Sequence, residues 1–163
     1  GRGRGVAFSS TLHKVPIGKA EVLREGQDLL ILALGASVYP ALSAAKELEK
    51  QGFSATVVNV RFIKPLDEPL ILSLAAQHGR VLTVEENVVA GGFGSAVLEL
   101  LADHDLFGVI VKRLGIPDVF VEHGTQDVLR KKYGLDAAGI LTSALAVLSQ
   151  PAQPKKVVWG TFN

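Results

Sequence analysis

The chain has 163 residues, 48% of them hydrophobic and 20% charged, with a formal net charge of +1. This is the composition of a globular protein long enough to bury one core, and the balanced charge gives no reason to expect nucleic acid or an anionic membrane as a partner. The absence of cysteine excludes a disulfide scaffold, a thiolate nucleophile and a metal ion held by cysteine.

The ends of the chain predict one domain within a longer polypeptide. There is no methionine, even at position 1, so we expect a piece of a larger protein. Residues 1–14 are rich in glycine and basic side chains, without periodicity, and predict a linker from a preceding domain. Residues 150–163 predict a tail, which leaves residues 15–149 as the folded domain. No apolar run reaches the roughly 20 residues of a membrane-spanning helix, and no membrane partner is expected.

Five segments predict β-strands. Lys19–Glu25 is expected to form a short edge strand before a turn. Leu29–Leu34 is a continuous apolar run, which is typical of a strand covered on both faces. Ser54–Val60 predicts a second central strand, Val81–Val84 a third and Val109–Val111 a fourth.

Helical patterns alternate with these strands. Ser37 is predicted to cap the first helix and Gly52 to end it. In the same way Asp67 is predicted to cap the second helix, which Gly79 ends. A third helix is expected over Ser95–His104. Its inward-facing residues are expected to be Val97, Leu98 and Leu101.

The last part of the chain continues the pattern with helices. Residues 118–124 are expected to be irregular, and Thr125 to cap a short helix. A final helix is predicted over Asp136–Leu148. Strands that alternate with helices predict an α/β fold of three layers, with a mainly parallel sheet of about five strands and helices on both faces.

The most distinctive stretch, residues 80–95, reads RVLTVEENVVAGGFGS. It predicts a strand, a glycine turn and a helix that starts near Phe93, a unit typical of parallel α/β proteins. Gly91 and Gly92 permit a positive φ or a close approach of two segments, and the helix start directs positive charge into the turn. Such a turn can hold a phosphate, but the pattern matches neither Gly-x-Gly-x-x-Gly nor the P-loop. A structural turn is therefore the favoured interpretation.

Candidate catalytic side chains are few. Glu85 and Glu86 stand at the carboxyl edge of the sheet, where function gathers in such folds, but neighbours on a strand point to opposite faces and make a poor acid/base couple. His78 and His104 end helices, where a histidine has a structural use. His123 lies in a loop ahead of a helix, although a turn or cap is favoured there too. With no metal-ligand cluster and no serine nucleophile motif, these residues predict a domain that supports a site and does not contain one.

Several motifs occur together in this chain. They are VPIGKAEVLREG (15–26), LALG (32–35) with VYPAL (38–42), ATVVNVRFIKPLD (55–67), TVEENVVAGGFGSAV (83–97), and LGIPD (114–118) with EHG (122–124). Together they resemble the last domain of the 1-deoxy-D-xylulose-5-phosphate synthases, over roughly residues 1–148. The Arg-x-x-x-Pro-Leu-Asp and Glu-Glu-Asn parts also resemble transketolases and the beta subunits of 2-oxo-acid dehydrogenases.

The resemblance implies part of a thiamine-diphosphate enzyme, a transketolase-type transferase. Such an enzyme joins pyruvate to glyceraldehyde 3-phosphate with loss of carbon dioxide, and its product feeds isoprenoid, thiamine and pyridoxal synthesis. The resemblance further implies that thiamine diphosphate and Mg²⁺ bind to two preceding domains, and that this domain binds neither and is inactive alone. Its partners would be the other domains of the same chain and a second subunit in a homodimer. The implied location is the bacterial cytoplasm, or the plastid stroma in a plant or alga.

The resemblance also suggests site residues. Arg2 aligns with the arginine of a Tyr-Pro-Arg-Gly-Asn-Gly segment that contacts the substrate phosphate, although Gly1 replaces the proline and Arg4 the asparagine. No catalytic, cofactor-binding or metal-binding residue is expected. Instead the domain is expected to complete the fold and build the homodimer, and to self-associate when isolated through the face near the glycine turn. The expected loop or interface residues are Glu85, Glu86, Gly91, Gly92, Phe93 and His123.

Two alternatives stay open. In the first, the chain is an anion-binding regulatory module in which the glycine turn and Arg61 or Lys64 hold the ligand. In the second, it is the equivalent domain of a 2-oxo-acid dehydrogenase beta subunit and contacts an acyltransferase partner. The Val-Pro-Ile-Gly and Glu-His-Gly segments favour the synthase over this second alternative.

Overall fold

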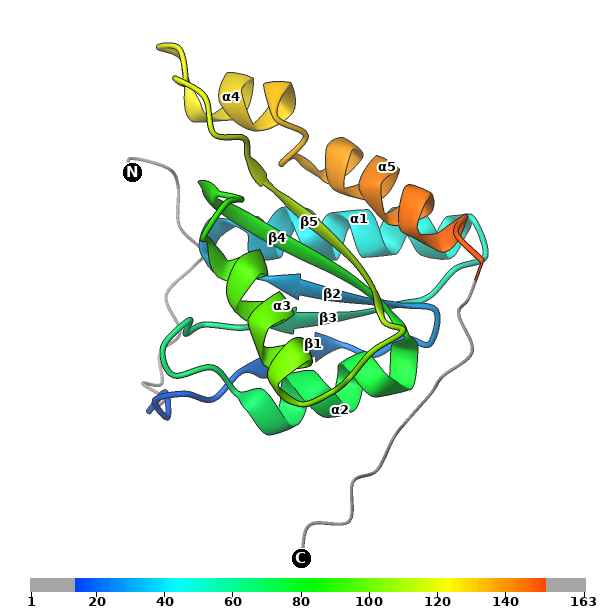
Figure 1. The fold of residues 1–163 in the computed structure, drawn as a ribbon. Coiled ribbons are helices and arrows are strands. Elements are labelled where there is room, and N and C mark those ends of the chain that lie inside the picture. Colours follow the sequence, from blue (N-terminus) through cyan, green and yellow to red (C-terminus); the bar gives the residue numbers. More distant parts are fainter. Residues whose placement is uncertain (1–13, 152–163) are drawn as a thin grey trace, which may run out of the picture.

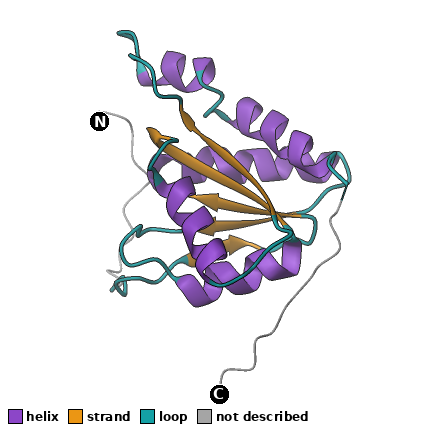
Figure 2. Ribbon diagram, in the orientation of Figure 1, coloured by secondary structure: helices purple, strands orange, loops and turns teal. Residues whose placement is uncertain are grey.

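A computed structural model describes residues 14–151 (Figures 1 and 2). Most of the predicted tail and of the predicted linker, Arg2 included, lies outside the described residues. The described chain forms a five-stranded sheet in the order β1-β3-β2-β4-β5, with β1 antiparallel to β3 and all other neighbours parallel. The strands are β1 (Glu21–Arg24), β2 (Leu29–Ala33), β3 (Ala55–Asn59), β4 (Arg80–Val88) and β5 (Ile110–Ile116).

Helices cover both faces of this sheet. The helices are α1 (Val38–Lys50), α2 (Glu68–His78), α3 (Phe93–Asp103), α4 (Gln126–Lys132) and α5 (Ala137–Leu148), with a 3-10 turn, η1 (Gly35–Ser37), ahead of α1; all but α4 pack on the sheet. α1 and α5 pack on one face, and α2 and α3 on the other (Figure 1). The predicted three-layer α/β fold with a mainly parallel sheet is therefore confirmed. None of the helices within residues 14–151 is long and apolar enough to cross a membrane.

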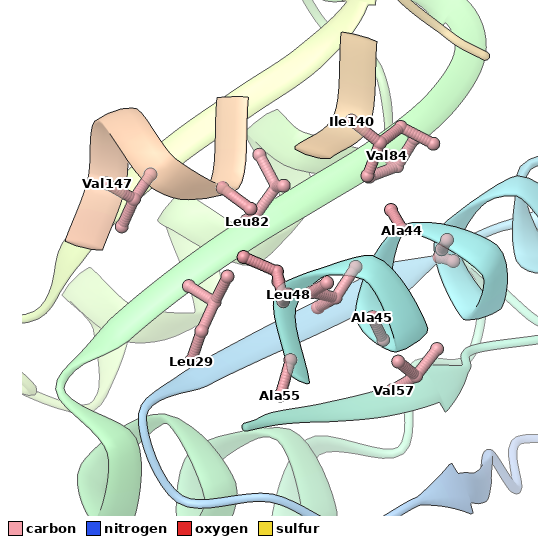
Figure 3. Close-up of a cluster of buried hydrophobic side chains, with 14 of the residues drawn as sticks. Leu29, Ala44, Ala45, Leu48, Ala55, Val57, Leu82, Val84, Ile140 and Val147 are labelled. Atoms are coloured by element: carbon pink, nitrogen blue, oxygen red, sulfur yellow. The ribbon is translucent and has the colours of Figure 1, made fainter. Parts of the chain in front are cut away.

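Strand β2 lies at the centre of the core. All five of its residues are fully buried, because helices cover both of its faces. Leu29 and Ile31 belong to the cluster between the sheet and α1 and α5, together with Leu48 and Ile140 (Figure 3). Leu30 belongs to the cluster on the opposite face. Burying a side chain of this size contributes about 1.5–3 kcal/mol to the stability of the fold. A strand buried on both faces therefore consists of apolar residues only, and this run is visible in the sequence.

Two strands are longer than predicted. β4 does not end at Val84 but continues through the two glutamates to Val88, and β5 does not end at Val111 but reaches Ile116. The two strands pair along this extension, with a register shift between Val84 and Val88, whose partner is Ile116. Apart from the buried Glu85 and Gly115, the extra residues are partly or fully exposed, so pairing between the two strands, and not a continuous apolar pattern, holds them in the sheet.

Two residues predicted to cap helices occupy the N-cap position but do not form the capping hydrogen bond. Ser37 and Asp67 stand at the N-cap positions of α1 and α2, but neither side chain caps its helix. The Ser37 hydroxyl is buried and has no hydrogen-bond partner among the described residues. The Asp67 carboxylate instead accepts hydrogen bonds from the Ala20 N–H at 3.1 Å and the Lys19 ammonium at 3.3 Å. Asp67 therefore holds the segment before β1 against the start of α2.

The other predicted helix caps and the predicted end of α2 are confirmed. Thr125 accepts a hydrogen bond from the Val128 N–H, and Asp136 caps α5. Gly79 ends α2 with a φ of 67°. The prediction that Leu98 of α3 faces the core is wrong, because this side chain is 39% exposed.

Candidate functional site

The turn between β4 and α3 lies at the carboxyl edge of the sheet. Glu85 is fully buried there, whereas Glu86 is exposed. The two side chains diverge, because successive residues of a strand point to opposite faces. Only Glu85 is therefore part of the turn's interior.

Glu85 neutralises the start of α3. Its Oε2 accepts a hydrogen bond from the Phe93 N–H at 2.6 Å, and its Oε1 accepts one from the Gly94 N–H at 2.8 Å. The Asn87 amide donates a third, at 3.2 Å. The first N–H groups of a helix have no partner within the helix, and this end is positive. The N-cap residue, Gly92, has no side chain, so a carboxylate from the neighbouring strand does the work of a cap.

Glycines make this close approach possible. A Cβ on Gly92 would lie 2.3 Å from the Val88 carbonyl oxygen and 2.4 Å from Glu85 Oε2. A Cβ on Gly94 would lie 2.6 Å from the Thr83 hydroxyl oxygen. All three distances are shorter than a Cβ atom tolerates, so these positions require glycine for space. Gly91 differs, because its φ is +72° and nothing lies within 4 Å of its missing Cβ.

Arg113 on β5 holds the other side of the turn. Its guanidinium donates to the Val89 carbonyl at 3.0 Å and to the Ser95 hydroxyl oxygen at 2.8 Å. Ser95 donates in turn to the same carbonyl and accepts from the Gly91 N–H. The residues of the turn are thus joined to both neighbouring elements. Neither Arg113 nor Gly115 is among the residues predicted above. No local pattern indicates the role of Arg113, whereas an isolated glycine within a strand, such as Gly115, does indicate a close backbone approach.

This geometry does not suit a phosphate loop. The two N–H groups that would face an anion already bind Glu85. Of the two candidate cations, Arg61 forms an ion pair with Glu21 of β1. Lys64 is exposed and lines, together with the glycine turn, a cavity of about 510 Å³, but Glu99 lines the same cavity. The charges around this cavity therefore balance.

The histidines lie apart from the turn. His78 is buried, with Nδ1 2.8 Å from the Leu74 carbonyl oxygen and Nε2 2.9 Å from the Thr56 hydroxyl oxygen, so it ties α2 to β3. His104 lies at the end of α3, 4.0 Å from Glu68. His123 is exposed in the segment between β5 and α4, and within residues 14–151 it has no hydrogen bond to the Glu85 turn.

Two ion pairs involve α4, one to the end of β4 and one to the loop before α4. The Arg130 guanidinium donates to Glu86 at 2.6 Å, which joins α4 to the end of β4. Lys132 pairs with Glu122. The hydrogen bond from Lys132 lowers the pKa of the Glu122 carboxyl, and the same bond raises the pKa of Lys132. Within the described residues, no group of three or more histidine, aspartate or glutamate side chains is placed to hold a metal ion.

Comparisons with known proteins give consistent results. A family model described as the C-terminal domain of transketolase matches residues 18–140. The chain is 52% identical over 154 residues to 1-deoxy-D-xylulose-5-phosphate synthase 1 of Geobacter sulfurreducens, a match that covers 94% of this chain and 24% of that protein. It is 54% identical over 158 residues to the synthase of a Cyanothece species, covering 96% of this chain and 25% of that protein. The chain thus spans about a quarter of the length of these curated relatives.

The chain is also similar to solved structures, one of which covers nearly all of it. This structure is a chain described as a split-gene transketolase in an inactive beta4 tetramer, with a TM-score of 0.79 and 39% sequence identity. The match covers 90% of this chain and 46% of that chain. The similarity therefore extends over nearly all of the described fold.

Proposed function

The chain belongs to the transketolase C-terminal domain family, and from this membership we propose that it is the C-terminal domain of a 1-deoxy-D-xylulose-5-phosphate synthase. The observation that carries the proposal is the identity of 52% and 54% to two curated synthases over nearly the whole chain. In this proposal the full-length enzyme joins pyruvate to glyceraldehyde 3-phosphate with loss of carbon dioxide, with thiamine diphosphate and Mg²⁺ as cofactors. Its product enters isoprenoid, thiamine and pyridoxal synthesis. The proposed location is the bacterial cytoplasm, because these relatives come from bacteria.

The described residues do not fit the diphosphate of the cofactor. The glycine turn is the element that could cradle such a group, but Glu85 already accepts hydrogen bonds from the Phe93 and Gly94 N–H groups. A second anion at this place would meet a buried carboxylate and would find these two donors in use. In the proposal, thiamine diphosphate and Mg²⁺ therefore bind to other domains of the full-length enzyme, and this domain is inactive alone.

A calorimetric titration tests this assignment of roles. Titrating the isolated chain with thiamine diphosphate and Mg²⁺ should give no heat of binding, because Glu85 occupies the one helix start that the glycine turn opens. The full-length synthase of Geobacter sulfurreducens, titrated in the same buffer, is the positive control. A dissociation constant in the micromolar range for the isolated chain would contradict the assignment.

The proposed role of the domain is architectural: it completes the enzyme's fold and helps to build a homodimer. Large apolar side chains are exposed at and beyond the carboxyl edge of the sheet, among them Val88 and Phe120, as expected for a surface that other chains cover. The similar split-gene transketolase chain, which lacks activity in its beta4 form, offers a precedent for self-association. Glu85, Gly91 and Gly92 are proposed to keep the turn beside this surface in one conformation.

Neither alternative function has an observation in its favour. For an anion-binding module, Arg61 is already paired with Glu21, and Lys64 shares its cavity with Glu99. For a dehydrogenase beta subunit, the identities above point to synthases instead.

A domain exchange tests the proposed function directly. Residues 14–149 replace the corresponding domain of the Geobacter sulfurreducens synthase, and formation of 1-deoxy-D-xylulose 5-phosphate from pyruvate and glyceraldehyde 3-phosphate is measured. We expect activity comparable to that of the parent enzyme, whereas the synthase truncated before this domain should be inactive. A chimera that folds and dimerises but forms no product would refute the proposal.

A further inference from the structure

The segment between β5 and α5 extends beyond the body of the fold. It comprises Pro117–Lys132, which we call the arm, and it follows β5 away from the sheet (Figure 1, yellow). Every residue from Pro117 to Val128 is exposed, and α4 contains no buried residue. The arm therefore contributes nothing to the two cores of the domain.

The arm is nevertheless apolar at its tip. Phe120 is completely exposed, with a relative accessibility of 104%, and its neighbours Val119 and Val121 are 56% and 40% exposed. Val128 on α4 is 61% exposed. Single exposed apolar residues are common, but four of them within one projecting segment are typical of an interaction surface.

Two ion pairs link the arm to the body of the fold and to itself. The Glu86–Arg130 pair joins α4 to β4, and the Glu122–Lys132 pair joins α4 to the loop before it. On the inner side of α4, Leu129 is half-buried. An arm that is already ordered loses less conformational entropy when it docks than a flexible segment would.

The outer side of α4 is complementary to itself. At about 100° per residue, Lys131 lies about 40° and Val128 about 100° around the helix from Asp127, so the three share one face. Within residues 14–151, Asp127 and Lys131 form no ion pair. If two copies of α4 pack antiparallel, Asp127 of each copy lies opposite Lys131 of the other, with Val128 between the two pairs. Such reciprocal contacts are the mark of a two-fold interface.

We propose that the arm is a docking surface for the arm of a second copy of this chain, with α4 packed against α4 across a two-fold axis. The inference rests on the proposed function and specifies which surface forms the homodimer. The charge of the arm supports this partner: its three acidic residues match its three basic ones, so the surface attracts neither an acidic nor a basic macromolecule. The acidic residues are Asp118, Glu122 and Asp127, and the basic residues are Arg130, Lys131 and Lys132.

Sedimentation of the isolated chain over a range of concentrations tests the inference. We expect a dimer with a micromolar dissociation constant, because the arm is smaller than the roughly 20–30 residues per side of a standard interface. Phe120→Ser should weaken dimerisation by at least about tenfold. The matched control is Phe107→Ser, which removes a phenylalanine that is 62% exposed just before β5, at the opposite end of that strand, and should have no effect.

Charge reversal tests the antiparallel arrangement. Lys131→Asp should weaken the dimer, because it places aspartates opposite each other, and the double variant Asp127→Lys with Lys131→Asp should restore it. A wild-type dimer that Phe120→Ser and Lys131→Asp leave unchanged would overturn the arm as the interface and leave the proposed function standing. A wild-type chain that stays monomeric up to about 1 mM would also overturn it, and the domain exchange would then decide the proposed function independently.

Discussion

Replacing Glu85 by glutamine should lower the free energy of unfolding by about 2–3 kcal/mol. The side chain is fully buried and its two oxygens accept hydrogen bonds from the Phe93 and Gly94 N–H groups. Glutamine has the same shape but only one oxygen, so its NH₂ group must face one of these two donors. The substitution also removes a negative charge from the positive start of α3. Urea unfolding of the isolated chain, followed by circular dichroism, measures the loss.

Glu86→Gln is the matched control for this experiment. Glu86 is the next residue of the same strand, but its side chain is 39% exposed and its one ion pair, with Arg130, lies at the surface. The expected loss is below about 1 kcal/mol, because exposed ion pairs contribute little. If Glu85→Gln were as mild as Glu86→Gln, the hydrogen bonds to the start of α3 would not be holding the turn.

Gly92→Ala should have the other large effect, a loss of at least about 2 kcal/mol in the free energy of unfolding. The new Cβ would lie 2.3 Å from the Val88 carbonyl oxygen and 2.4 Å from Glu85 Oε2. One of these contacts is with backbone and the other with a side chain held by hydrogen bonds, so neither neighbour can move freely. The same unfolding measurement applies.

Gly91→Ala separates lack of space from backbone conformation. Gly91 has open space around its missing Cβ, but its φ of +72° disfavours any residue with a side chain. We expect a smaller loss, about 1 kcal/mol. The order of the two variants is the critical result, and a Gly91→Ala variant less stable than Gly92→Ala would contradict this description of the turn.

The sequence predicts the fold well where one physical signal dominates. The continuous apolar run of β2 is the centre of the sheet, and Gly79 ends α2 in the left-handed conformation that favours glycine. These features depend on a few residues that are neighbours in the sequence, so a local sequence pattern is enough to predict them. The edge strand β5 shows the opposite case, because Lys112 and Arg113 interrupt its apolar pattern and only its pairing with β4 makes it long.

The turn shows why the site was harder to predict. The sequence indicates that adjacent glutamates diverge and that the glycines are constrained, but it does not show which glutamate is buried. Glu85 reaches N–H groups 8 and 9 residues further along the chain, and Arg113 lies 18 residues from its partner Ser95. Asp67 has the pattern of a helix cap, yet a segment 47 residues earlier binds its carboxylate. The roles of these three side chains depend on contacts between segments that are distant in the sequence, and a local sequence pattern cannot predict such contacts.

The central claim is that this domain contributes architecture, not chemistry, to a synthase. The most direct test is the rate of pyruvate decarboxylation by the chimera described above when it carries Glu85→Gln, measured per folded dimer. We expect a rate within about threefold of the unmodified chimera, together with a less stable domain, because a carboxylate that only caps α3 takes no part in proton transfer. A loss of about 100-fold or more, with the dimer and the fold intact, would make Glu85 a chemical group and contradict the claim.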